Sequence, residues 1–261
     1  AMKKTFDIQG CVAFVTGANK KDGMGRAFVD ALLVGGANKV YATARNVSQL
    51  DELVESSNGK VIAVSLDVTD KDAISKLGTQ FPDVNLVINN AGHGYMCNSL
   101  TVDPENAMKE MEINYFGPMR IVQSFKANLQ RGSENDGKAN GSCSAALVNN
   151  ASINSFLQNP NATGYGCSKA AVHYLTDALR RDLGENTLVI GVYPGGIDTD
   201  MIAKLDGFDK LAPASVAVEL LDALKEGKEH IFPASKKSIN RFLEQSNKDL
   251  KQEVEIDSTY G

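Results

Sequence analysis

The sequence predicts one α/β domain, with a doubly wound parallel sheet of about seven strands and helices on both faces. Two observations lead to this prediction. Short apolar segments alternate with segments of helical periodicity along most of the chain, and the first apolar segment runs directly into a glycine-rich turn. Alternation at this interval implies right-handed βαβ crossovers and therefore parallel strands. The sequence has no internal repeat, and the alternation of strand and helix patterns gives no sign of a second domain, so residues 1–261 are expected to form a single domain.

The strands are expected where apolar residues run together without a polar face, because a parallel sheet is covered on both sides. The expected strands cover residues 11–16, 39–43, 61–66, 85–89, 145–150, 188–193 and 230–232. The expected helices cover residues 24–33, 48–53, 70–77, two segments between 104 and 129, 163–183, 214–224 and a polar tail from 235. Ser48 and Thr69 are the expected starts of two of these helices, and a break is expected near Asn114 and Gly117.

Composition excludes several classes of function. A net charge of −5 and a pI near 5.3 leave no electrostatic footprint for nucleic acid. No run approaches the roughly 20 apolar residues that span a bilayer. The four cysteines (Cys11, Cys97, Cys143, Cys167) have no metal-ligand spacing. A reduced, cytoplasmic setting is therefore expected, with no metal, no membrane and no nucleic acid as partner.

The glycine-rich turn runs from Thr16 to Gly25 between the first strand and the first helix. Glycines at this point let the backbone approach a pyrophosphate, which the N-terminus of the following helix stabilises. The expected contacts are Gly17, Gly23, Met24 and Gly25. A plain glycine-rich βα turn is the alternative.

The residues at the end of the second strand indicate whether the cofactor is NAD(H) or NADP(H). Sites selective for NAD place an acid there for the ribose 2′-hydroxyl, but this strand ends Thr43-Ala44-Arg45 with no carboxylate. A guanidinium suits a 2′-phosphate, and Lys20 or Lys21 could add charge. NADP(H) is therefore expected over NAD(H). The alternative is that Arg45 is a solvated loop cation.

Tyr165 and Lys169 lie four apart on the long helix, so their side chains share one face. A nearby ammonium favours the ionised form of a phenol, which makes the tyrosine a plausible acid/base. Taken alone, the pair could equally be a chance surface pair.

Together these features resemble the short-chain dehydrogenase/reductase family across nearly the whole chain, and so a Rossmann-type fold. The motifs that carry the resemblance are the glycine turn, Asp67-Val68, Asn89-Asn90-Ala91-Gly92, Asn114, Ser152 thirteen residues before Tyr165, Tyr165-x-x-x-Lys169 and Pro194-Gly195-Gly196-Ile197-Asp198-Thr199.

The resemblance implies four catalytic residues. Tyr165 would give a proton to the carbonyl oxygen, and Lys169 would lower the pKa of that tyrosine and hold the nicotinamide ribose. Ser152 would bind the substrate oxygen, with Ser155 as its rival, and Asn114 would hold a water of a proton relay. For the cofactor, the resemblance implies contacts from Asp67, Val68, Asn90, Ala91, Gly92, Tyr165, Lys169, Pro194, Gly195, Ile197 and Thr199.

The function expected is reversible hydride transfer between NADP(H) and a carbonyl or secondary alcohol. The alternatives are a catalytically weak NADP(H)-sensing regulator, or a C=C reductase or epimerase on the same scaffold. A homodimer or homotetramer is expected through the helices from Tyr115 to Leu129 and from Thr163 to Leu183. The glycine turn is two residues longer than the family's usual turn, and the polar loop at 131–144 is also long.

The sequence selects no substrate. The expected pocket segments, residues 93–98, 153–158 and 201–208, carry few charges and mildly favour an uncharged, partly apolar carbonyl. The three histidines, His93, His173 and His230, are expected to be ordinary structural or surface residues.

Overall fold

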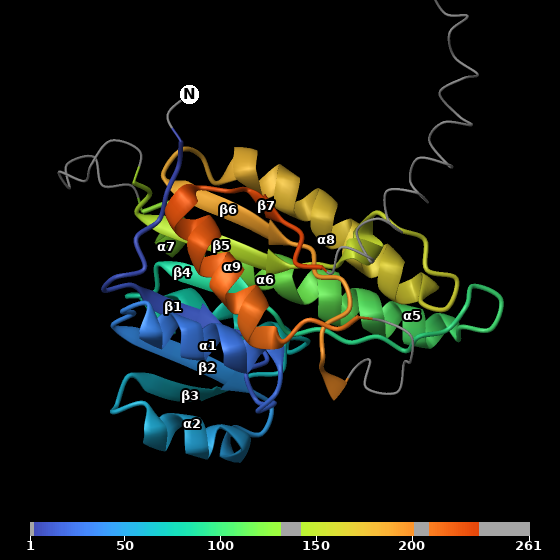
Figure 1. Cartoon of the computed structure of the whole chain (residues 1–261), viewed down its shortest axis with the longest axis horizontal. Coiled ribbons are helices and arrows are strands. Elements are labelled where there is room, and N and C mark those ends of the chain that lie inside the picture. Colours follow the sequence, from blue (N-terminus) through green and yellow to red (C-terminus); the bar gives the residue numbers. More distant parts are fainter. Residues whose placement is uncertain (1–2, 132–141, 201–208, 235–261) are drawn as a thin grey trace, which may run out of the picture.

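Seven parallel strands form the centre of the computed structural model, which describes residues 3–131, 142–200 and 209–234. The strand order is β3-β2-β1-β4-β5-β6-β7 (Figure 1). The strands are β1 (Val12–Val15), β2 (Lys39–Ala44), β3 (Val61–Ser65), β4 (Leu86–Asn89), β5 (Ala145–Asn150), β6 (Thr187–Val192) and β7 (His230–Ile231). This confirms the doubly wound α/β fold with a seven-stranded parallel sheet.

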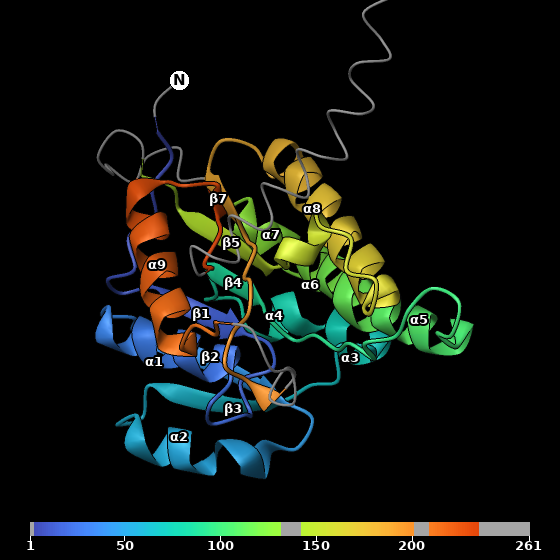
Figure 2. The ribbon, with the colours of Figure 1, turned by 45° about the vertical axis from the view of Figure 1, so that its right-hand side comes forward.

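Helices cover both faces of this sheet. Figure 2 shows α1 (Met24–Val34) and α9 (Pro213–Glu226) on one side and α6 (Gly117–Ser124) and α8 (Thr163–Asp182) on the other. The remaining helical elements are η1 (Val47–Leu50), α2 (Asp51–Ser56), α3 (Lys71–Ser75), α4 (Leu77–Gln80), α5 (Pro104–Met111), η2 (Glu112–Phe116), α7 (Lys126–Leu129) and η3 (Ile153–Ser155). None of the helices in the described ranges is both long and apolar enough to cross a bilayer.

Each face of the sheet has its own apolar core. Leu32 of α1 and Leu220 of α9 are fully buried in one core. Phe14 of β1 lies on the other face, with its ring centroid 5.0 Å from that of Phe125. β1, β4, β5 and β6 are buried along most or all of their length, as continuous apolar strands between two helical layers must be. The two cores hold the carboxyl ends of the strands in fixed register, and the functional residues follow those ends.

Several predicted helix boundaries were wrong, and the caps explain why. Asn46, not Ser48, accepts the backbone N–H of residue 48 and starts η1. Asp70, not Thr69, caps α3, with its carboxylate accepting the N–H groups of Asp72 and Ala73. Asn and Asp accept these open N–H groups well, so they compete with a neighbouring Ser or Thr for the start of a helix.

The predicted break near Asn114 and Gly117 is confirmed as an interruption of the α-helix, because α5 ends at Met111 and α6 begins at Gly117. The chain between them stays helical and forms a π-helical turn, η2, with Asn114 buried inside it. A second interruption, at Phe125 with φ and ψ of −87° and 10°, ends α6. Ile121 and Val122 are buried within the chain, whereas Tyr115 and Phe116 are half-buried. The subunit interface expected on these helices stays a prediction.

Candidate active site

A cleft of about 880 Å³ opens at the carboxyl edge of the sheet. It lies where β1 has β2 on one side and β4 on the other, the point at which the strand order reverses and doubly wound sheets bind ligands. The sequence-predicted residues that line it are Gly17, Gly23, Met24, Gly25, Arg45, Asp67, Val68, Asn90, Ala91, Gly92, Ser152, Tyr165, Lys169, Pro194, Gly195, Ile197 and Thr199. Asn114 does not line the cleft, but its side chain is bonded to His93, which does.

The glycine turn is packed so tightly that two of its glycines cannot be replaced without movement. Gly17 has a positive φ of 69°, and a Cβ on it would lie 2.9 Å from the Cα of Ala91. A Cβ on Gly25 would lie 2.3 Å from the carbonyl oxygen of Gly17. The Asn90 side chain fixes the same turn, because its Nδ2 donates to the carbonyls of Thr16 and Gly17 at 2.9 and 3.1 Å. Asn90 therefore shapes the cofactor turn as well as lining the cleft.

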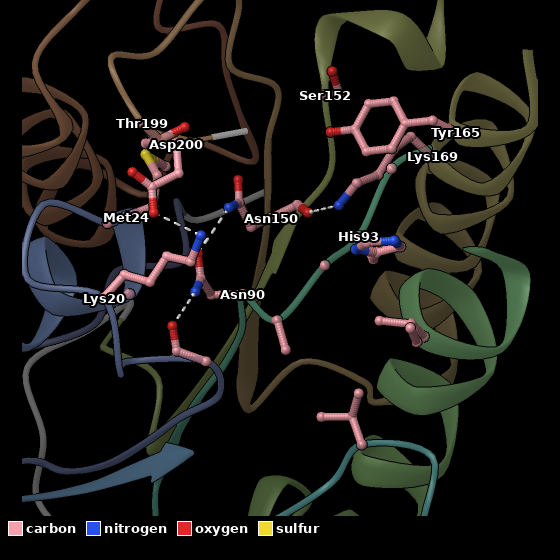
Figure 3. Close-up of a pocket in the computed structure, with 18 of the residues that line it drawn as sticks. Lys20, Met24, Asn90, His93, Asn150, Ser152, Tyr165, Lys169, Thr199 and Asp200 are labelled. Atoms are coloured by element: carbon pink, nitrogen blue, oxygen red, sulfur yellow. Dashed lines mark hydrogen bonds and ion pairs between the residues drawn. The ribbon is translucent and has the colours of Figure 1, made fainter. Parts of the chain in front are cut away.

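Side chains of the longer glycine turn form ion pairs and a hydrogen bond with residues on both sides of the cleft. Lys21 pairs with Glu52 of α2 at 2.9 Å, and the Asn19 amide donates to Gln49 at 3.1 Å. Lys20 pairs with Asp200 on the opposite lip at 2.8 Å (Figure 3). These pairs are exposed, so each contributes little stability. Asn19 and Lys20 themselves line the cleft.

The dinucleotide end of the cleft has the donors that a phosphate group requires. Helix α1 begins at Gly23 with no side-chain cap and no acidic residue in its first turn, so its open N–H groups face the cleft with a partial positive charge. Arg45 is exposed on the rim at the end of β2. Asp67 also lines this end, and its Oδ1 accepts from the backbone N–H and hydroxyl of Thr69. The residues present fit a nicotinamide dinucleotide.

Tyr165 and Ser152 meet at the other end of the cleft, one from the first turn of α8 and one from the end of β5 (Figure 3). Burial raises the pKa of Tyr165 to about 12, while the hydrogen bond from Ser152 acts to lower it and the charge of Glu110 to raise it. The rival Ser155 turns away, since its hydroxyl donates to the Lys169 carbonyl at 2.8 Å.

Lys169 is 4% exposed and points toward the same corner. Its Nζ donates to the carbonyl of Asn150 at 2.7 Å and lies 5.6 Å from the centre of the Tyr165 ring. Burial lowers the pKa of this lysine to about 8. Lowering of the Tyr165 pKa by Lys169 was expected, but in this geometry burial dominates and the direction is upward. The ammonium sits over the ring face, bound to a carbonyl.

Asn114 supports the site from the π-helical turn. Its Oδ1 accepts the His93 N–H, and its Nδ2 donates to the His93 carbonyl and the Ser168 hydroxyl, each at 2.8 Å. Both amide protons are therefore in use. The Oδ1 atom accepts one hydrogen bond and has a second lone pair, so the side chain keeps one acceptor position for a relay water.

The family model described as short chain dehydrogenase matches residues 11–209, which is more than half of the chain. The chain belongs to the short-chain dehydrogenase family. It is an oxidoreductase family that acts with a nicotinamide cofactor. In this chain the glycine turn, the Tyr165–Lys169 pair and Ser152 line one cleft.

Three similar proteins show how far the similarity extends. An uncharacterized oxidoreductase of Staphylococcus aureus (strain USA300) is 32% identical over 228 residues, which cover 83% of this chain and 92% of that protein. The short chain dehydrogenase tazN of Aspergillus terreus is 28% identical over 76% of this chain, and the matched part is 44% of that protein. A crystal structure of a short chain dehydrogenase from Burkholderia cenocepacia in complex with NADP is 31% identical, with a TM-score of 0.81 over 95% of this chain and 98% of that one.

The remaining predicted cofactor contacts of the dehydrogenase motif follow β6. Pro194 accepts the Ile153 N–H at 2.9 Å, which holds the segment after Ser152 against this loop. Ile197 is 6% exposed and pairs with Leu211 in an isolated bridge. Thr199 lies on the rim close to Asp200 (Figure 3). The expected pocket segment 201–208 and most of the 131–144 loop lie outside the described residues.

Asn150 is a site residue that sequence reasoning missed. Its Nδ2 donates to Asn90 Oδ1 at 3.0 Å, and its backbone carbonyl accepts from Lys169 Nζ. Asn150 therefore connects Asn90, which holds the glycine turn, to Lys169 beside Tyr165 (Figure 3). Its Oδ1 is buried without a hydrogen-bond partner among the described residues. The sequence signal that could have identified Asn150 is a polar residue at the end of an apolar strand, because a buried polar side chain needs hydrogen-bond partners.

His93 also lines the cleft, whereas His173 is structural, with its Nδ1 2.8 Å from the buried Tyr193 hydroxyl.

Proposed function

We propose that this protein is an NADP(H)-dependent oxidoreductase that interconverts a carbonyl and a secondary alcohol, with Tyr165 as general acid/base. The observation that carries the proposal is the meeting of Tyr165, Ser152 and Lys169 in the cleft that also contains the glycine turn. A pure sensor of dinucleotides would not need a buried hydroxyl pair beside a buried ammonium.

The side chains divide the chemistry between them. NADPH, when bound, supplies a hydride to the substrate carbon. Negative charge then develops on the carbonyl oxygen, where fixed hydroxyl groups lower the barrier. Ser152 orients that oxygen, and Tyr165 donates the proton. A pKa of about 12 keeps Tyr165 protonated at neutral pH, which is the form that a carbonyl reductase requires.

Lys169 would hold the ribose hydroxyls of the nicotinamide end. Its Nζ is already fixed by the Asn150 carbonyl, and two of its three protons remain for other acceptors. A Cβ on Gly92 would lie 3.5 Å from this Nζ, so glycine at 92 keeps the space in front of the ammonium open. We assign the adenine end to Asp67 and Val68, which follow β3, and the carboxamide end to Ile197 and Thr199, which follow β6. These two strands lie on opposite sides of β1, the strand that leads into the glycine turn.

Replacing Arg45 by alanine is expected to weaken NADPH binding by about 10–100-fold and to change NADH binding by less than about twofold. The reason is that a 2′-phosphate loses its guanidinium partner, whereas NADH has no phosphate there. Fluorescence titration with each dinucleotide measures the two dissociation constants. Arg181→Ala serves as the control, because Arg181 is an exposed arginine of α8 and does not line the cleft. Equal affinity of the parent protein for NADPH and NADH would remove the basis of the assignment.

The proposed function is tested by NADPH oxidation across aldehydes, ketones, quinones and keto esters, with NADH run in parallel. We expect turnover of at least one uncharged, partly apolar carbonyl and a preference for NADPH. Tight NADPH binding with no turnover on any of these compounds would instead favour the sensing role. Turnover of activated alkenes alone would favour C=C reduction.

A further inference from the structure

Helix α5 buries one side chain, and that side chain is a carboxylate. Glu110 is 1% exposed, whereas the other residues of α5 are partly or fully exposed. Its Oε2 atom has no hydrogen-bond partner among the described residues. A buried carboxylate without a complete set of partners is costly, so its place beside the active site requires a physical reason.

The Oε1 atom of Glu110 holds one wall of the cleft. It accepts the backbone N–H of Tyr95 at 2.7 Å. Tyr95 belongs to residues 93–97, the wall segment, most of which lines the cleft. Asn114 binds one end of the wall segment at His93, and Glu110 binds its middle. The carboxylate therefore supplies an anchor at a point where the wall segment belongs to no helix or strand.

The Oε2 atom lies against the start of α8. A Cβ on Gly164 would lie 2.2 Å from it, so the carboxylate fills the space that a side chain at residue 164 would take. Gly164 immediately precedes Tyr165. The first turn of α8 has no acidic residue, and Ala162 provides no side-chain cap. The Glu110 charge thus faces the positive end of a 20-residue helix, where an anion is favoured.

The wall segment also packs closely against the Tyr165 ring. A Cβ on Gly94 would lie 2.9 Å from Tyr165 Cδ2 and 3.0 Å from Met96 Cε. Met96 itself has a positive φ of 52°, a conformation that a non-glycine residue keeps only when its surroundings hold it. Beyond these contacts, the Thr163 N–H at the start of α8 donates to the Cys97 carbonyl at 3.1 Å.

We propose that Glu110 is a positioning residue that holds the wall segment against the first turn of α8 and so sets the substrate-facing surface beside Tyr165. This inference rests on the proposed function of the cleft for its effect on turnover, but not for its effect on the wall segment. The two oxygens have separate tasks: Oε1 binds the wall segment, and Oε2 faces the helix. The charge of Glu110 also acts on Tyr165, whose pKa it raises, after the larger effects of burial and Ser152.

The test compares Glu110→Ala, Glu110→Gln and the control Glu105→Gln, since Glu105 is an exposed carboxylate of the same helix. Two readouts are used. The first is the rate of Cys97 alkylation by iodoacetamide, followed peptide by peptide in a mass spectrometer. The buried Cys11 in the same samples reports any global unfolding. The second is the separate measurement of KM and kcat for the carbonyl with the highest turnover in the screen, together with the NADPH dissociation constant.

Glu110→Ala is expected to speed Cys97 alkylation at least about tenfold and to raise the carbonyl KM by a similar factor, with a smaller change in kcat. NADPH affinity and Cys11 labelling stay within about twofold, because the glycine turn is not involved. Glu110→Gln keeps an acceptor for the Tyr95 N–H, so most of the wild-type KM and labelling rate is expected to return. Glu105→Gln is expected to match the wild type.

Unchanged Cys97 labelling and unchanged KM in Glu110→Ala would overturn the proposal. If that variant unfolds, as fast labelling of Cys11 would reveal, Gly164→Ala provides the second test. Its methyl group would displace the carboxylate from the wall segment and is expected to speed Cys97 labelling; unchanged labelling in this variant also overturns the proposal. If the wild type turns over no carbonyl, the proposed function fails, whereas the labelling experiment still decides the role of Glu110.

Discussion

The Tyr165→Phe variant is expected to lose about 10²–10⁴-fold in kcat for carbonyl reduction. The phenylalanine ring keeps the packing against Gly94 and the first turn of α8, so only the proton donor is removed. NADPH binding is expected to stay within about threefold, because one neutral hydroxyl contributes little to the whole dinucleotide. Steady-state NADPH oxidation and a fluorescence titration measure the two quantities.

Tyr174→Phe is the matched control for this substitution. Tyr174 lies on the same helix, is 80% exposed and does not line the cleft. The two variants lose the same atom in different surroundings, and only the first should lose activity. If Tyr165→Phe kept more than about a tenth of the wild-type turnover, the assigned proton donor would be wrong.

The Lys169→Met variant is expected to be inactive and yet no less stable than the parent at pH 7, with a gain on the order of 1 kcal/mol. Burial lowers the folded-state pKa of Lys169 to about 8 from 10.5, so folding keeps an ammonium where the charged form is disfavoured. Methionine removes that penalty and fills similar space. The gain is limited, because the Asn150 carbonyl loses its donor.

The sign of the pH dependence follows from the same pKa. Between about pH 8 and 10.5 the unfolded state binds the Lys169 proton more tightly than the folded state does, so the parent gains stability as pH rises through this window. The methionine variant lacks this gain. Its stability advantage is therefore largest below pH 8 and shrinks toward pH 10. The folded phenol of Tyr165 stays protonated below pH 10, and its ionisation in the unfolded chain is the same in both proteins, so it cancels from the comparison.

Urea unfolding of the parent and Lys169→Met at pH 7, 9 and 10 measures this difference. An advantage that did not change with pH would show that Lys169 titrates alike in the folded and unfolded chains. Turnover is expected to fall at least about 10²-fold at every pH, since the ammonium lies over the Tyr165 ring and, in the proposed function, holds the nicotinamide ribose.

Local patterns were sufficient to predict the layered fold and most of the cleft. The apolar segments ending at Thr16, Thr43 and Asn89 predicted three strands of a parallel sheet, and the residues after parallel strands meet at one edge. The pairing of Ser152 with Tyr165 came from the resemblance to the short-chain dehydrogenase/reductase family, and both residues line the same cleft. The exact helix starts were less predictable: Asn46 and Asp70 took the caps expected of Ser48 and Thr69, because several side chains in a row can accept the same N–H groups.

The chain by itself determined which residues can do chemistry at the carboxyl edge, because strand periodicity and residue type are local properties. Only the tertiary structure decided what surrounds them. The pKa of Tyr165 rises because the folded protein excludes water from it, and Lys169 is fixed by a carbonyl from β5. Glu110 becomes important because α5, the wall segment and α8 meet at one buried carboxylate. Burial, desolvation and contacts between distant segments exist only once the chain has folded.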